Sequence, residues 1–214
     1  MNRNRPSGSS DRRRTGRSIA AARAARRKRI RWITAVAVIV VIVGGITALR
    51  LVNRSAAPSA SGTGQPVVGA AAVDGSFTTV DGKTETVASL RGQPTLLWFV
   101  ATWCPSCQAG TSAVAQEFPQ LRAAKLKVVE VELYQNFGQS GPSIQDFGKS
   151  EAGTRWGDPN WIFGTSSQQL TNAYDTEGAS DIYYLLDPSG RVAYVNSSPA
   201  ATLPDLLAHA ARLT

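Results

Sequence analysis

The sequence holds two cysteines, Cys104 and Cys107, and only Pro105 and Ser106 separate them. On the first turn of a helix this spacing brings two sulfur atoms close enough to form and break a disulfide bond. Free backbone N–H groups and the positive end of the helix dipole at that turn stabilise a thiolate. We therefore expect Cys104 to be the nucleophile. Cys107, further into the helix, is expected to resolve the mixed disulfide.

The residues around the pair are expected to tune this chemistry. Pro105 stiffens the turn and removes one N–H, while Ser106 keeps another, so the dipeptide should influence the reduction potential. Trp103, just before the first cysteine, is expected near the surface beside the sulfur atoms, where its ring would contact substrates.

Two structural roles for the pair are less favoured. Half of a zinc knuckle needs a second ligand pair, and the single histidine, His209, lies near the end of the chain. A permanent disulfide across so small a ring would stabilise the fold little, because the entropic gain rises with loop length. The sequence thus favours a redox-active disulfide over a structural zinc site or a permanent disulfide.

The pair sits between a predicted buried strand, Thr95–Val100, and a helix that begins near Cys104. The turn-rich stretch 153–164 is expected to be a loop near the active face. Alternating strands and helices predict an α/β fold with a mixed central sheet and flanking helices. The other expected elements are short strands over 69–92 with a turn at Asp81-Gly82, a strand at Lys127–Leu133, helices at Ser143–Ser150 and Ser167–Ala173, an antiparallel hairpin of Ile182–Leu186 and Arg191–Val195, and a final helix at Leu203–Arg212.

Composition divides the 214 residues into four regions. Residues 1–31 carry twelve Lys or Arg and one acid, so the net charge of +8 becomes −3 over the remainder. This basic stretch is expected to be a disordered tail. An uncharged apolar run begins at Trp32 and predicts a single transmembrane helix over 32–52. A flexible linker over 53–66 and a folded domain over 67–214 follow.

The charge asymmetry predicts the orientation of this chain in a membrane. Basic residues concentrate before the apolar run, and only Arg50 and Arg54 follow it closely. The positive-inside rule then places the N-terminus in the cytoplasm and the C-terminal domain outside it, with no role in nucleic-acid binding. Cleavage in the Ala/Ser-rich stretch Ser55–Gly62, which would release a secreted domain, is the alternative.

Two stretches, DGKTETVASLRGQPTLLWFVATWCPSC (81–107) and YYLLDPSGRVAYV (183–195), resemble the membrane-anchored TlpA/ResA-like thiol-disulfide oxidoreductases of the thioredoxin-like superfamily. The resemblance implies a thioredoxin-like fold and disulfide exchange outside the cytoplasm. It also implies protein thiol or disulfide substrates, a membrane electron donor or acceptor, and no bound cofactor.

The sequence departs from that family at three positions. Asp181 stands where the family carries a cis-proline, Trp98 replaces the buried acid six residues before the first cysteine, and Gly110 replaces a glutamate three residues after the second. We expect Asp181 to substitute for the missing acid, because a carboxylate near Cys104 either disfavours the thiolate or accepts its proton.

The resemblance leaves two other functions open. Sco-like copper-delivery proteins share the fold and a similar hairpin, and two thiolates bind the soft ion Cu(I). The domain could also be a thioredoxin-fold adaptor without turnover. The direction of electron flow and the client protein are not encoded in any motif that we identify.

Overall fold

The computed structural model of the protein describes residues 64–213. The predicted basic tail, the predicted transmembrane helix over 32–52 and most of the predicted linker lie outside them. Over residues 64–213, no helix has the length and apolar character needed to cross a bilayer. Gln65, near the end of the predicted linker, already donates a hydrogen bond to the hydroxyl of Tyr184, 2.7 Å away.

One seven-stranded sheet, in the order β2-β1-β5-β4-β3-β6-β7, forms the centre of the fold. Strands β3, β4 and β5 run parallel, and the remaining pairs are antiparallel. The prediction of an α/β fold with a mixed central sheet is therefore confirmed. The strands are β1 (Ser76–Thr79), β2 (Thr84–Thr86), β3 (Thr95–Val100), β4 (Lys127–Glu132), β5 (Trp161–Ser166), β6 (Ile182–Leu186) and β7 (Val192–Ser197).

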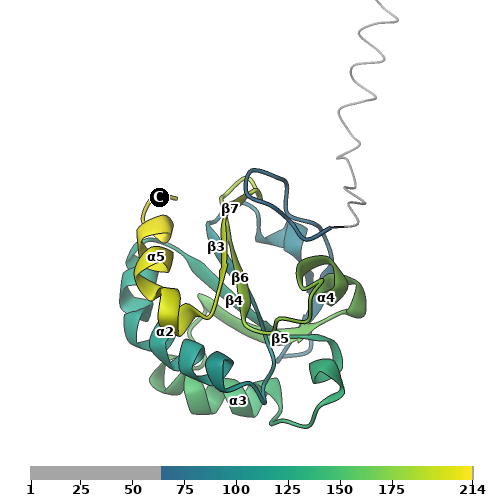
Figure 1. Cartoon of the computed structure of the whole chain (residues 1–214). Coiled ribbons are helices and arrows are strands. Elements are labelled where there is room, and N and C mark those ends of the chain that lie inside the picture. The colour runs from purple at the N-terminus through teal and green to yellow at the C-terminus, as the bar shows by residue number, and fades with distance from the viewer. Residues whose placement is uncertain (1–63, 214) are drawn as a thin grey trace, which may run out of the picture. The chain divides into compact units, whose positions relative to one another are not determined.

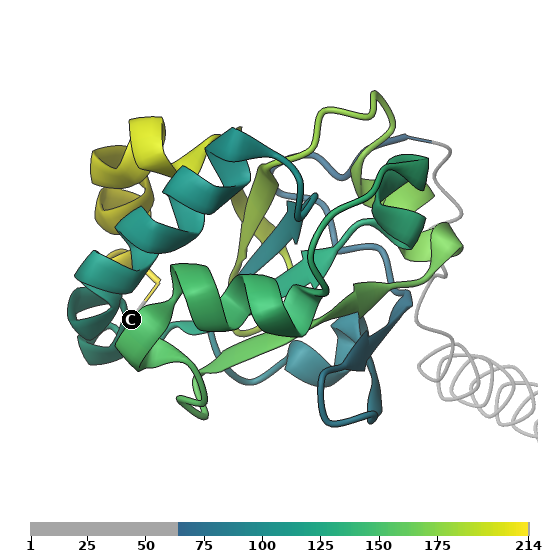
Figure 2. The same cartoon turned by 90° about the horizontal axis from the view of Figure 1, so that it is seen from below.

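Helices cover both faces of the sheet. Helices α2, α3 and α5 lie on one face and α4 on the other (Figures 1 and 2). The helices are α2 (Pro105–Ala123), α3 (Ile144–Glu151), α4 (Gln168–Tyr174) and α5 (Pro199–Ala210), with 3₁₀ turns η1 (Val87–Leu90), η2 (Tyr134–Gly138) and η3 (Gly153–Arg155).

Strand β3 lies near the middle of the sheet and is buried along its whole length. Its alternate side chains enter two separate cores: Trp98 packs beneath α2 and α5, and Phe99 packs toward α4. A strand covered on both faces needs apolar residues at every position, which explains the uninterrupted apolar run. A short connection after Val100, the last residue of β3, leads to Cys104 at the start of α2.

The stretch 153–164 is a loop only in its first part, and it does not lie near the active face as we expected. Its second part, from Trp161, is strand β5, and Trp161 lies in register with Val128, which pairs with Leu96 near the start of β3. Strands β3, β4 and β5 are parallel, and Cys104 follows the C-terminal end of β3. Trp161, at the N-terminal end of β5, therefore lies at the opposite end of these strands. The turn formers Gly157 and Pro159 precede the strand and mask its short apolar pattern.

Candidate active site

Cys104 is the N-cap of α2, with Pro105 in the first helical position as predicted. Its Sγ accepts a hydrogen bond from the backbone N–H of Cys107 at 3.3 Å and lies 3.1 Å from the hydroxyl of Ser106. Burial opposes ionisation of this thiol. The hydrogen bonds from Cys107, Ser106 and Ser180 outweigh burial and hold the pKa of Cys104 below its ordinary value.

Cys107 has the opposite environment. Both cysteines are free thiols, and Cys107 is fully buried whereas 5% of Cys104 is exposed. Burial, followed by the negative charge of Asp181, raises the pKa of Cys107 well above its ordinary value. The electrostatics therefore favour the thiolate on Cys104 and the protonated thiol on Cys107. The nucleophile is less open to solvent than its predicted role suggested.

Ser180 is a site residue that sequence reasoning missed. Its hydroxyl lowers the pKa of Cys104, although 76 residues separate the two in the chain. The buried carboxylate of Asp175 holds this segment in place by accepting the N–H groups of Ala179 (2.7 Å) and Ser180 (3.3 Å). The residues Gly178-Ala179-Ser180 are typical of a loop. A serine in a loop does not indicate which distant side chain it will contact, so its role beside Cys104 could not be predicted.

Asp181, singled out from the sequence, lies beside the cysteine pair and is 1% exposed. Its Oδ1 accepts a hydrogen bond from the indole N–H of Trp98 at 2.9 Å. Its Oδ2 has no hydrogen-bond partner within the described residues. Burial raises the pKa of this carboxyl to about 6, against the opposing effects of the nearby Ser106, Trp98 and Ser198.

The backbone at Asp181 is left-handed, with φ 81°, and Ser180 before it has φ 33°. No cis peptide bond occurs over residues 64–213. The Asp181 N–H donates to the carbonyl of Phe99, and its carbonyl accepts from Ser198, both at 2.9 Å. These two bonds fix a conformation that non-glycine residues rarely adopt, and such strain is concentrated at functional sites.

Trp98 and Gly110, two of the departures from the family pattern, are linked because their side-chain positions occupy the same space. A Cβ added at Gly110 would lie 2.8 Å from Cζ2 of Trp98. The indole thus occupies the space that a side chain at position 110 would need. A tryptophan on β3 is therefore incompatible with a glutamate at position 110, and its N–H reaches Asp181 instead.

Trp103 is half-buried and anchored to η2, the turn that follows β4. Its indole N–H donates to the carbonyl of Asn136 at 2.9 Å. The Asn136 side chain in turn accepts from the N–H of Thr102 at 2.9 Å and donates to its hydroxyl at 2.8 Å. Gln135, Asn136 and Phe137 are all left-handed, with φ of 50–56°. A weak sequence signal exists for this turn, since Asn136 and Gly138 lie two residues apart.

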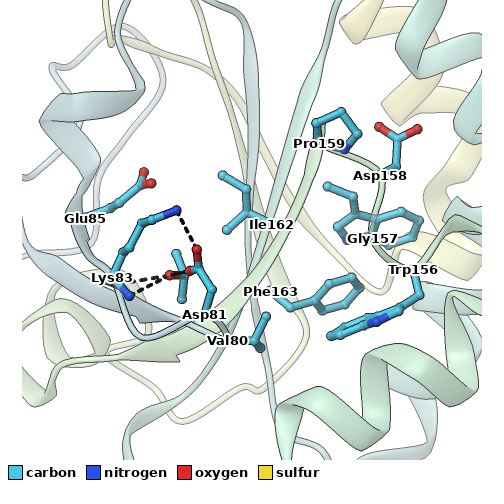
Figure 3. A pocket seen from close by; sticks show the side chains of 12 residues that line it. Val80, Asp81, Lys83, Glu85, Trp156, Gly157, Asp158, Pro159, Ile162 and Phe163 are labelled. Carbon is cyan, nitrogen blue, oxygen red and sulfur yellow. Dashed lines mark hydrogen bonds and ion pairs between the residues drawn. The ribbon is translucent and has the colours of Figure 1, made fainter.

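A separate cavity of about 420 Å³ lies between the β1–β2 turn and the segment that leads into β5 (Figure 3). Trp156 and Phe163 lie on one side of it, and the ion pair of Asp81 with Lys83 lies on the other. No residue of the cysteine site lines this cavity. The lining residues are Thr79, Val80, Asp81, Lys83, Glu85, Trp156, Gly157, Asp158, Pro159, Trp161, Ile162 and Phe163.

Several solved structures share this fold. A candidate protein disulfide isomerase from Bacteroides thetaiotaomicron is 19% identical, with a TM-score of 0.53 over 69% of this chain and 90% of that one. A candidate thiol:disulfide interchange protein DsbE from Chlorobium tepidum is 20% identical, with a TM-score of 0.51 over 68% and 99%. Copper-bound ScoI from Arabidopsis thaliana is 18% identical, with a TM-score of 0.50 over 68% and 100%.

These likenesses confirm the thioredoxin-like fold. No curated protein matches the sequence. The sequence pattern of the AhpC/TSA family matches residues 68–195, which include β1 to β6, α2 and both cysteines. The chain therefore belongs to the AhpC/TSA family and has a thioredoxin-like fold.

Proposed function

We propose that this protein is a thiol-disulfide oxidoreductase that acts on protein substrates through Cys104 and Cys107. The opposite pKa shifts of the two thiols at the start of α2 carry the proposal. Membership of a thiol-based redox family and disulfide-exchange proteins among the structures of similar fold support it.

The reaction has two exchange steps. The Cys104 thiolate attacks a substrate disulfide, forms a mixed disulfide and releases one substrate thiolate. Cys107 then gives up its proton and attacks the Cys104 sulfur, which releases the second substrate thiolate. The protein dithiol becomes a disulfide and the substrate disulfide becomes a dithiol. The reverse sequence oxidises a substrate dithiol.

Asp181 is proposed to accept the Cys107 proton in the second step. It is a buried carboxylate beside that thiol, its Oδ2 has no partner within the described residues, and burial raises its pKa to about 6. Asp181→Asn should slow the resolving step and change the pH dependence of alkylation of Cys104 and Cys107. Unchanged pH profiles for both thiols would refute this role.

Trapping of mixed disulfides tests the proposed function. A Cys107→Ala variant of an oxidoreductase should accumulate partners that are disulfide-linked through Cys104 and released by reductant, and a Cys104→Ala variant should trap none. An adaptor without turnover would give no linked partners with either variant. The proposal fails if, in addition, the reduced wild-type protein exchanges with no disulfide.

The reduction potential of the Cys104–Cys107 couple would give the direction of electron flow. A value near about −270 mV favours a reductase fed by a membrane electron donor, and one near about −120 mV favours an oxidant.

Copper delivery is the competing function. Within residues 64–213, no group of three or more His, Cys, Asp or Glu side chains is arranged to hold a metal ion. A stoichiometric Cu(I) complex of the reduced protein would favour that competitor.

A membrane tether with the domain outside the cytoplasm is also proposed. The uncharged run from Trp32 and the basic residues before it support this topology. The full chain expressed in bacteria should stay with the membrane after alkaline extraction. A membrane-impermeant maleimide should label Cys104 in intact spheroplasts. Labelling only after lysis would contradict the orientation, and recovery in the soluble fraction would contradict the tether.

A further inference from the structure

Glu130 is a second buried acid beneath the cysteine helix, and the reaction above does not use it. It lies on β4 and is fully buried. Its Oε2 accepts the indole N–H of Trp161 at 3.1 Å. Its Oε1 lies 2.6 Å from the hydroxyl of Thr111 on α2. The same hydroxyl lies 2.9 Å from the backbone carbonyl of Cys107.

The hydrogens of this cluster decide the protonation state of Glu130. The Thr111 hydroxyl carries one hydrogen, and the carbonyl of Cys107 can only accept. Both contacts of Thr111 are therefore hydrogen bonds only if the carboxyl of Glu130 supplies the second hydrogen. The chain of donors then runs from Glu130 to Thr111 and from Thr111 to the Cys107 carbonyl. An ionised Glu130 would compete with that carbonyl for the single hydroxyl hydrogen.

The charges that surround Glu130 favour its neutral form. Burial is the main cause that raises its pKa to about 8, and it outweighs the hydrogen bonds that Thr111 and Trp161 would donate to an ionised carboxylate. Asp181, just before β6, and Glu151, on α3, raise it further by repulsion. The ion pairs found over residues 64–213 join other residues, so no Lys or Arg there compensates a charge on Glu130. On the α2 side, the titratable side chain within this core is that of Cys107.

We propose that Glu130 is a positioning residue that works as a neutral acid. By donating to Thr111, it leaves the Thr111 hydroxyl free to bond the Cys107 carbonyl, which holds the resolving cysteine in the first turns of α2. Ionisation of Glu130 would turn the hydroxyl toward the carboxylate, release that carbonyl and place a negative charge beneath the turn. This inference rests on the proposed function of the cysteine pair.

The kinetics of the resolving step test the inference. With a chromogenic aromatic disulfide as substrate, Cys104 releases the first chromophore and Cys107 releases the second, so stopped-flow absorbance separates the two steps. Above about pH 8, the second rate of the wild type should fall about fivefold below its extrapolation from lower pH, which corresponds to the loss of one hydrogen bond between neutral groups. The first rate should show no such break.

Variants separate positioning from general packing. Glu130→Gln donates to Thr111 from a group that does not titrate, so the break near pH 8 should vanish. Glu130→Ala and Thr111→Val should slow the second step at every pH, and Gln should rescue what Ala loses. Glu117→Gln is the matched control, because it removes a carboxylate of α2 that contacts Gln120 and is not among the groups that raise the pKa of Glu130. This control should keep the break.

Infrared difference spectra give a readout that is independent of turnover. At pH 7 the wild type should show the carbonyl band of a protonated carboxylic acid, which disappears above about pH 8 and is absent from Glu130→Gln. A wild type that exchanges disulfides but lacks this band, or a Gln variant that retains the break, would overturn the role of Glu130. A wild type that exchanges no disulfide would overturn the proposed function while the band still reported on Glu130.

Discussion

At the scale of single residues, the two thiols of the pair differ through the groups that contact them. The thiol and the backbone N–H of Cys107 and the hydroxyls of Ser106 and Ser180 favour the Cys104 thiolate. Burial and the negative charge of Asp181 oppose the ionisation of Cys107. The backbone donor comes from the helix start itself, as in any N-capping residue. The two serine hydroxyls are the groups that substitution can remove one at a time.

Removal of either hydroxyl should slow the reaction of Cys104. We expect Ser106→Ala and Ser180→Ala each to lower its iodoacetamide alkylation rate at pH 7 by about three- to tenfold, since a hydrogen bond to a charged group contributes about 1.5–3 kcal/mol and solvent screens part of it. Ser112→Ala, in α2 but facing Glu151 of α3, is the control. Equal rates for all four proteins would show that Cys107 and the helix start, without the serine hydroxyls, stabilise the Cys104 thiolate.

At the scale of secondary structure, the sequence predicted the elements with strong local patterns. The apolar run of β3, the start of α2 and the β6–β7 hairpin around Asp187-Gly190 all occur where the pattern placed them. Strand β5 was missed because a turn-rich segment precedes its short pattern. The last helix begins at Pro199, four residues before its predicted start. The left-handed segments at 135–137 and 180–181 had only weak local signals, since tertiary hydrogen bonds hold them.

The candidate site divides in the same way. Cys104, Cys107 and Pro105 follow from one short motif. The positions of Ser180, Thr111 and Glu130 depend on how distant strands and helices meet. Asp181 was found by alignment to a family pattern, and its contact with Trp98 needed the register of β3 against β6.

The contact of Trp98 on β3 with Gly110 on α2 predicts how the stability of the domain responds to a larger side chain at position 110. In an open helical position, Gly→Ala stabilises a protein by about 0.5–1 kcal/mol. At Gly110 the added Cβ meets a buried indole, so Gly110→Ala should instead destabilise by about 1–3 kcal/mol, as overpacked cores do.

Urea denaturation of a double-mutant cycle measures this packing. In a Trp98→Leu background, the cost of Gly110→Ala should fall by more than half, because the smaller side chain leaves room for the methyl group. Ser112→Ala should change the free energy of unfolding by less than about 0.5 kcal/mol. A Gly110→Ala variant as stable as the wild type would mean that the indole is free to move aside.

At the scale of the whole domain, the buried acids belong to one layer beneath α2. Tyr183, Trp98, Glu130 and Phe163 lie in register across β6, β3, β4 and β5. Trp98 extends this layer to Asp181 through its indole N–H, and Thr111 connects it to α2. The domain therefore encloses two carboxyl groups next to its reactive helix, and both influence its stability.

Their raised pKa values predict how stability depends on pH. Burial raises the pKa of Glu130 from 4.5 to about 8 and that of Asp181 from 3.8 to about 6. An acid whose folded pKa exceeds its unfolded pKa contributes stability that is fully present below the unfolded value. That stability is lost as pH rises through the folded value. The free energy of unfolding should therefore fall between about pH 4 and pH 8.

The Glu130→Gln variant isolates the larger of these contributions. It should gain stability relative to its parent by about 3–5 kcal/mol as pH rises from about 4 to 9, because each pKa unit corresponds to about 1.4 kcal/mol. Both proteins should carry Cys104→Ser and Cys107→Ser, which remove thiol ionisation from the comparison. Urea titrations at several pH values measure the difference. A difference that does not change with pH would mean that Glu130 keeps its ordinary pKa of 4.5 in the folded domain. Glu130 would then be ionised at neutral pH, and its hydrogen bond to Thr111 would run from the hydroxyl to the carboxylate.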